Sequence, residues 1–174
     1  MFKEERDRPL FKWTDLGNID EGRPNLGPLM PVVVYRLFQY TLRDILIVEQ
    51  GVEFANRILR RSGWQAGWAF CENLLNPDLD FNAFLSQLQS RLRELNVGVL
   101  RVEKADLEKG EFTLTVAEDL DCSGLPMTDE VVCTYDEGFI AGILERYTGK
   151  PFNVREIDCW ASGGRTCRFQ VLAK

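Results

Sequence analysis

Apolar residues recur at helical spacing over four stretches in the first half of the chain. The stretch from Val32 to Val48 is apolar around most of its circumference, so this helix should be buried on more than one side. Residues 51–75 predict two helices separated by a break at Ser62-Gly63. Asp80 precedes the most regular amphipathic pattern, from Phe81 to Leu95, which we interpret as packing against the core.

The second half of the chain alternates between strand and helix patterns. Residues 97–103 and 111–118 predict a hairpin around Lys109-Gly110, and the second of these strands alternates cleanly between apolar and polar positions. A helix follows Cys133, with Thr134 and Glu137 as a capping box and Gly149 at its C-terminus. Residues 152–158 and 166–172 then predict a second hairpin, which turns at residues 162–164.

This order of elements indicates an α+β fold. N-terminal helices should pack on an antiparallel sheet that is built from two hairpins with a helix between them. Residues 1–30 are polar and rich in Pro and Gly, and we interpret them as an N-terminal arm; residues 31–174 form one domain of ordinary size. Leu10, Phe11, Trp13 and Leu16 either dock the arm on the body or a second subunit, or belong to a partly ordered tail.

Composition excludes several classes of function. The net charge of −6 argues against nucleic acid as a partner, because binding to phosphates needs a basic face. No apolar run is long enough to span a membrane and the charged start does not resemble a signal peptide, so we expect a cytoplasmic protein without a membrane partner. The absence of histidine excludes His general-base catalysis, and we do not expect a stand-alone enzyme.

Cysteines mark the boundaries of the C-terminal elements. Cys159 and Cys167 should face each other across the mouth of the second hairpin, at a separation that suits two thiolates sharing a metal. Cys133 lies before a helix N-terminus, where the helix dipole favours the thiolate. Glu156 can converge with Cys159 only if the strand bends near Ile157-Asp158, since strict alternation puts them on opposite faces.

The pattern of Cys133, an aromatic-Gly helix, Glu156-x-x-Cys159, a Gly turn and Cys167-x-Phe169 resembles the 4-vinyl-reductase-type domain. The resemblance is specific over about residues 97–173, weaker from Pro31 to Asn96, and does not cover the first thirty residues. That family includes small-molecule-binding proteins and the sensor domains of aromatic-hydrocarbon-responsive transcription activators, and its fold is similar to that of TRAPP-complex subunits.

The resemblance implies a zinc ion (Zn²⁺), because sensor members of the family hold zinc with three Cys and one Glu. The matching residues here are Cys133, Glu156, Cys159 and Cys167. Cys122 lies in the acidic loop Glu118–Pro126, which we interpret as solvated, and is an alternative fourth ligand that would give a four-Cys structural site. A disulfide between Cys159 and Cys167, or free buried thiols, also stay open.

We predict an apolar ligand cavity between the Val32–Val48 helix, the Trp64–Leu75 helix and the helix after Cys133. Small residues on the last helix, Gly138, Ala141 and Gly142, would let a ligand approach its backbone. The expected ligand-binding residues are Phe38, Trp64, Trp68, Phe139, Gly142 and Tyr147.

These observations favour a zinc-stabilised sensor-type domain that binds a small apolar or aromatic molecule and acts through a partner. The strongly apolar Val32–Val48 helix further predicts a homodimer. Two alternatives stay open: an accessory protein of tetrapyrrole (bacteriochlorophyll vinyl-group) metabolism, which the family name suggests, and a non-catalytic scaffolding subunit, which the TRAPP-like fold suggests.

Overall fold

The sheet is antiparallel throughout, and its strands follow the order β1-β2-β4-β3 in the computed structural model, which describes residues 5–174. Strands β1 (Val99–Asp106) and β2 (Glu111–Ala117) form the first hairpin, and β3 (Phe152–Asp158) and β4 (Cys167–Ala173) form the second. The hairpins join through β2 and β4, so that Val116 pairs with Cys167 at one end of the sheet.

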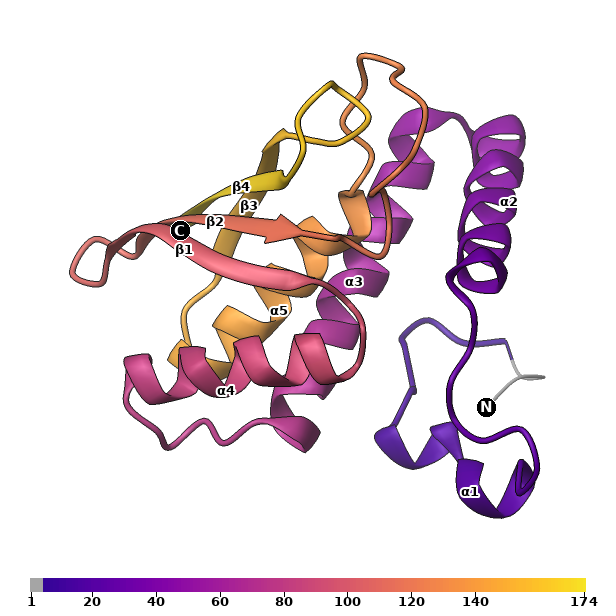
Figure 1. Ribbon diagram of the computed structural model, residues 1–174, viewed down its shortest axis with the longest axis horizontal. Helices are drawn as coiled ribbons and strands as arrows, with labels where there is room; N and C mark the ends of the chain where they lie inside the picture. The colour runs from indigo at the N-terminus through magenta and orange to yellow at the C-terminus, as the bar shows by residue number, and fades with distance from the viewer. Residues whose placement is uncertain (1–4) are drawn as a thin grey trace.

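Helices cover one face of this sheet. Helices α4 (Phe81–Glu94) and α5 (Thr134–Thr148) lie against it, and the next layer is α3 (Val52–Leu74), packed on α5 (Figure 1). Alternate residues of β3 are buried, as a strand with one covered face requires. The predicted α+β architecture, with two hairpins and an intervening helix, is therefore confirmed.

The predicted helix break at Ser62-Gly63 is wrong. Helix α3 runs without interruption from Val52 to Leu74, and Gly63 is buried within it. A β-carbon on Gly63 would overlap the carbonyl oxygen of Tyr135 in α5. This glycine is present because two helix backbones meet there, and it does not mark a turn.

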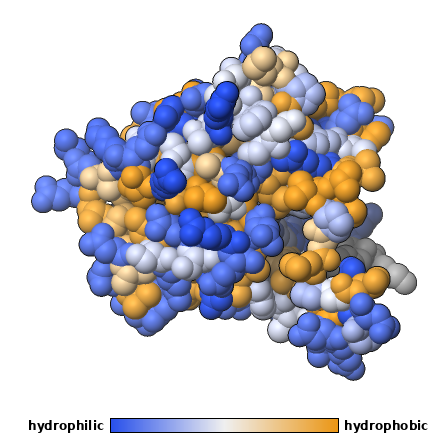
Figure 2. Space-filling model, viewed as in Figure 1, coloured by the Kyte–Doolittle hydropathy of each residue, from blue (hydrophilic) through white to orange (hydrophobic). Residues whose placement is uncertain are grey.

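Helix α2 (Val32–Gln50) is the outermost layer and has no buried residue. The expectation that it is buried on more than one side does not hold within a single chain, where Val33 and Phe38 are 71% and 68% exposed. Figure 2 shows apolar residues on the side of the molecule that α2 and the N-terminal arm occupy. The remaining face of α2 carries polar side chains that bind the loop after β2.

The N-terminal arm contains two short helical turns, Trp13–Leu16 and α1 (Ile19–Gly22). Phe11 and Trp13 border hollows on the surface of α3, next to Trp64 and Trp68. The first four residues of the predicted arm lie outside the described residues. Within residues 5–174, no helix is both long enough and apolar enough to cross a membrane.

Candidate metal centre and ligand cavity

Four thiols meet at one end of the sheet: Cys122, Cys133, Cys159 and Cys167. Their sulfur atoms all lie within 4.8 Å of one another, and every one of these residues is buried. The Sγ atom of Cys133 lies 3.9 Å from that of Cys159 and 3.7 Å from that of Cys167, while Cys122 and Cys167 are 3.0 Å apart. A tetrahedral zinc with Zn–S bonds of about 2.3 Å requires sulfur–sulfur distances of roughly 3.8 Å, so this arrangement fits a zinc ion.

Four separate elements deliver these thiols. Cys122 lies in the loop after β2, Cys133 is the N-cap of α5, Cys159 follows β3 and Cys167 begins β4. The pairing of β3 with β4 shifts register between Glu156 and Asp158, which is the bend that the sequence required near Ile157-Asp158. Because of this irregularity, Glu156 and Cys159 are both buried although they are three residues apart.

Glu156 lies outside the set of four close thiols. Its Oε2 atom accepts a hydrogen bond from the backbone N–H of Cys133 at 2.9 Å, and its Oε1 atom is buried without a hydrogen-bond partner. Burial raises the pKa of this carboxyl to about 8. In this structure Glu156 orients Cys133 through its backbone, and the alternative fourth residue, Cys122, completes the group.

The predicted capping box at the start of α5 is wrong, since no side chain caps this N-terminus. Glu137 is used elsewhere: its Oε1 atom accepts from the backbone N–H of Glu156 at 2.9 Å, and its Oε2 atom pairs with Arg60 of α3. One buried carboxylate thereby joins α3, α5 and β3 directly beside the thiol cluster.

The thiols influence one another's ionisation. Hydrogen bonds from the thiols of Cys122, Cys133 and Cys167 hold the pKa of Cys159 below its ordinary value. The corresponding interactions raise the pKa of Cys133 and of Cys167. The cluster therefore favours a thiolate at Cys159 and disfavours further negative charge, which a metal cation would compensate.

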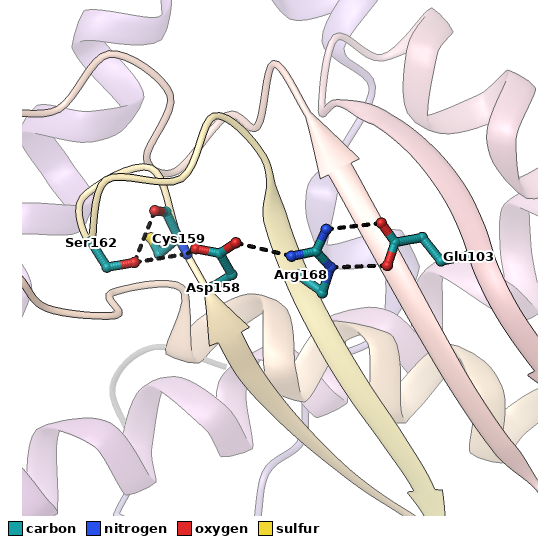
Figure 3. Close-up of polar contacts among 5 residues, drawn as sticks. All are labelled: Glu103, Asp158, Cys159, Ser162 and Arg168. Atoms are coloured by element: carbon teal, nitrogen blue, oxygen red, sulfur yellow. Dashed lines mark hydrogen bonds and ion pairs between the residues drawn. The ribbon is translucent and has the colours of Figure 1, made fainter.

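Surface contacts hold the chain around Cys159 in place. Its backbone N–H donates to the side chains of Asp158 and Ser162, and Asp158 also pairs with Arg168 of β4 at 3.0 Å (Figure 3). Arg168 reaches across β2 to Glu103 of β1 through two hydrogen bonds of 2.9 and 3.0 Å. These contacts connect the outer face of the sheet to the loop that carries a cluster thiol.

A cavity of about 50 Å³ lies between α4, the covered face of the sheet and α5. Its wall is apolar except for Asp119 and Asp136. The apolar wall comes from α4, from the sheet with the residue that leads into β1, and from α5: Phe81, Phe84, Leu85, Leu88, Leu92, Val97, Leu100, Val102, Phe112, Leu114, Val116, Phe139, Ile140, Ile143 and Leu144.

The ligand-binding residues expected from the sequence are not gathered around this cavity. Phe139 lies in its wall, and Tyr147 stacks on the wall residue Phe84 with ring centroids 3.9 Å apart. Phe38 is on the exposed face of α2. Trp64 and Trp68 contact each other on α3, beside the N-terminal arm.

The predicted role of Gly142 as a bare wall of a ligand site is wrong. A β-carbon on Gly142 would overlap the carbonyl oxygen of Trp64, and one on Gly138 would overlap that of Arg60. The small residues of α5 therefore allow α3 to approach its backbone, and no room is left for a ligand between these helices.

The acidic loop after β2 is folded into the protein and is not solvated as expected. Asp119 and Asp121 are 4% and 3% exposed. Burial raises the pKa of Asp119 to about 7 and moves the pKa of Asp121 and of Asp136 in the same direction. Tyr35 and Gln39 of α2 both donate hydrogen bonds to the Asp121 carboxylate, at 2.8 and 2.6 Å.

Sequence reasoning missed the α4 wall of the cavity and the buried position of Asp136. The α4 stripe was visible as the most regular amphipathic pattern, but a cavity wall and a solid core have the same periodicity. Asp136 lies four residues before Ile140 on the same face of α5, and this spacing was the available signal.

Comparisons with known proteins agree with the fold and with the sequence pattern around the cysteines. Residues 112–173 match the family model of the vinyl-4-reductase domain. The chain contains a vinyl-4-reductase domain. The match includes all four thiols of the cluster and the whole of α5, so the resemblance to the 4-vinyl-reductase-type family is confirmed.

Similar proteins extend the likeness beyond that segment. An uncharacterised protein of Methanocaldococcus jannaschii, MJ0150, is 26% identical over 157 residues, which are 90% of this chain and 84% of that protein. The phenol-responsive sensory domain of the transcription activator PoxR, solved with phenol, aligns with a TM-score of 0.65 at 16% identity, over 85% of this chain and 78% of that one.

A trafficking protein particle complex subunit 3 from Naegleria fowleri, covalently bound to palmitic acid, also aligns with a TM-score of 0.65. It is 13% identical, and the alignment covers 82% of this chain and 95% of that chain. At such identities the two solved structures establish the fold that this vinyl-4-reductase-domain chain shares with them.

Proposed function

We propose that this protein is a sensor-type domain that binds a small apolar molecule in the cavity between α4, the sheet and α5. The observation that carries the proposal is a cavity with an almost wholly apolar wall inside a vinyl-4-reductase-type fold. The solved PoxR sensory domain, which has this fold, responds to phenol, and this makes an aromatic molecule the first ligand to test.

The size of the cavity adds a condition. An apolar cavity of about 150 Å³ holds benzene, and the cavity here measures about 50 Å³. A ring-sized ligand therefore requires wall side chains to move outward. Helix α4 is the wall element most free to move, because its other side faces solvent and hydrogen bonds such as Gln89 to the carbonyl of Leu100 tie it to the sheet only locally.

The proposed cofactor is a structural zinc ion held by Cys122, Cys133, Cys159 and Cys167. Four thiolates fill a tetrahedral coordination sphere, so the ion would have no open position for water. It would tie the loop after β2, the start of α5 and both strands of the second hairpin together, and its binding free energy would add to the folding free energy.

The proposed output surface is the exposed apolar face of α2, with a second copy of this chain as its partner. An apolar patch of this kind on a folded protein is typical of an interaction site. The same face favours the scaffolding role as a second candidate function, since a scaffold needs an interface and no ligand. The tetrapyrrole accessory role has no comparable support from the described residues.

Calorimetric titration with toluene and phenol tests ligand binding. Wild-type protein should bind at least one of them saturably, and Ile143→Phe should abolish binding because Ile143 is 2% exposed and lies in the cavity wall. Ile157→Phe is the matched control, since Ile157 is 50% exposed on β3. Absence of binding to wild-type protein would overturn the sensor proposal and favour scaffolding.

A further inference from the structure

Two carboxylates interrupt the apolar wall of the cavity, and their surroundings differ. The Oδ1 atom of Asp119 accepts hydrogen bonds from the backbone N–H groups of Asp121 and Cys122, at 2.8 and 3.1 Å. Asp119 therefore has a structural role in shaping the loop after β2. Asp136 has no comparable role, because its Oδ2 atom is buried and has no hydrogen-bond partner.

The unpartnered oxygen belongs to the face of α5 that lines the cavity. Asp136 is in the first turn of α5, and Ile140, Ile143 and Leu144 follow at spacings of four, seven and eight residues. Residues at these spacings share one helix face, and all four lie in the cavity wall. Gln39 and Glu156 also have a buried side-chain oxygen without a partner among the described residues, but neither residue lines the cavity.

A buried acceptor without a donor is costly. Leaving such a group unpaired costs about 1–3 kcal/mol, and more when it is charged. A carboxylate in the first turn of a helix is partly stabilised by the helix dipole, but the dipole does not supply a hydrogen bond to Oδ2. A ligand that carries a donor group would remove this penalty, whereas a purely apolar ligand of the same shape would leave it in place.

We propose that Oδ2 of Asp136 accepts a hydrogen bond from the bound molecule, so that the ligand class is a small apolar molecule with one hydrogen-bond donor, a hydroxyl or an amine. This inference rests on the proposed function, because it names the polar end of the ligand for the same cavity. Asp136 is then the residue that discriminates between donor-bearing molecules and plain hydrocarbons of equal size.

Paired calorimetric titrations test the proposal. Phenol and toluene have nearly the same shape and differ in the hydroxyl, and the ratio of the toluene Kd to the phenol Kd reports the donor interaction. This ratio should fall about tenfold in Asp136→Leu, which removes the acceptor at similar side-chain size. Ile140→Val, one turn further along α5, should change both Kd values together and leave the ratio intact. Aniline in place of phenol should behave as phenol does.

The outcomes separate this inference from the proposed function. An unchanged ratio in Asp136→Leu, with both probes still bound, would overturn the role of Asp136 and leave the sensor function standing. If wild-type protein binds neither probe, both proposals fail. Infrared difference spectra of the wild-type protein provide a readout that does not depend on the variant folding: a carboxyl band should shift on binding phenol and not on binding toluene, and no shift with phenol would overturn the inference.

Discussion

The carbonyl oxygen of Trp64 occupies the position that a β-carbon on Gly142 would need. The same relationship holds in the opposite direction, because a β-carbon on Gly67 of α3 would overlap the carbonyl oxygen of Phe139. Glycines on both helices therefore let α3 and α5 approach at backbone distance. This contact fixes α5, whose N-terminus carries Cys133 and whose opposite face lines the cavity.

Gly142→Ala should destabilise the protein by about 3 kcal/mol, the upper end of the usual cost of overpacking, because the helices must separate to admit a methyl group. The free energy of unfolding in urea measures this effect. Gly22→Ala is the control, since nothing lies within 4 Å of the added β-carbon and the change should be close to neutral. Equal stability of the two variants would contradict the close helix contact.

The same glycines show where sequence reasoning reached its limit. Periodicity and turn residues were sufficient to predict α5, both hairpins and the α+β fold, because these are local signals. Gly63 and Gly142 were assigned to a helix break and a ligand wall, because a glycine that admits a turn, a ligand or another backbone looks identical in sequence. Only the tertiary contact between α3 and α5 distinguishes these cases.

The cluster of thiols was partly predictable. Cys133, Cys159 and Cys167 were expected together from their positions at element ends, and the structure brings them together. The position of Cys122 depended on whether the acidic loop was solvated or buried. That question is decided by contacts to α2 more than eighty residues earlier in the chain, which no local pattern reports.

Cys122→Ser should reduce the zinc content well below the one ion per chain expected of the wild type, since it removes one of four close sulfur ligands. Glu156→Gln should retain zinc, because its proposed role is to accept the backbone N–H of Cys133, and an amide oxygen can still do so. Elemental analysis of both purified variants measures the difference. Loss of zinc in Glu156→Gln together with its retention in Cys122→Ser would identify Glu156 as the fourth ligand. Cys71→Ser is the control, since Cys71 lies outside the cluster.

Phe38→Glu should convert the proposed homodimer to a monomer. Phe38 is 68% exposed in one chain, next to Leu37 at 65%, and a carboxylate in the centre of an apolar interface would be buried without a partner. Light scattering at micromolar concentration measures the mass. Leu107→Glu is the matched control, because Leu107 is 59% exposed after β1, far along the chain from α2, and the change should leave the mass unaltered. A monomeric wild type would refute the dimer.

The last prediction concerns the hydrogen bond from Tyr35 to Asp121, which attaches α2 to the loop that carries Cys122. The Asp121 carboxylate is buried and accepts from Tyr35 at 2.8 Å and from Gln39 at 2.6 Å. Tyr35→Phe removes one donor and leaves a buried carboxylate oxygen less well satisfied, so the free energy of unfolding should fall by about 2 kcal/mol. Because the adjacent residue is Cys122, the looser loop should also release zinc to a chelator faster. Tyr135→Phe is the control: no hydrogen bond of the Tyr135 hydroxyl is found among residues 5–174, so stability and zinc release should both stay near wild type. If Tyr35→Phe loses stability while zinc release is unchanged, α2 supports the fold but has no influence on the metal centre. If neither property changes, the hydrogen bond does not hold α2 to this loop in solution.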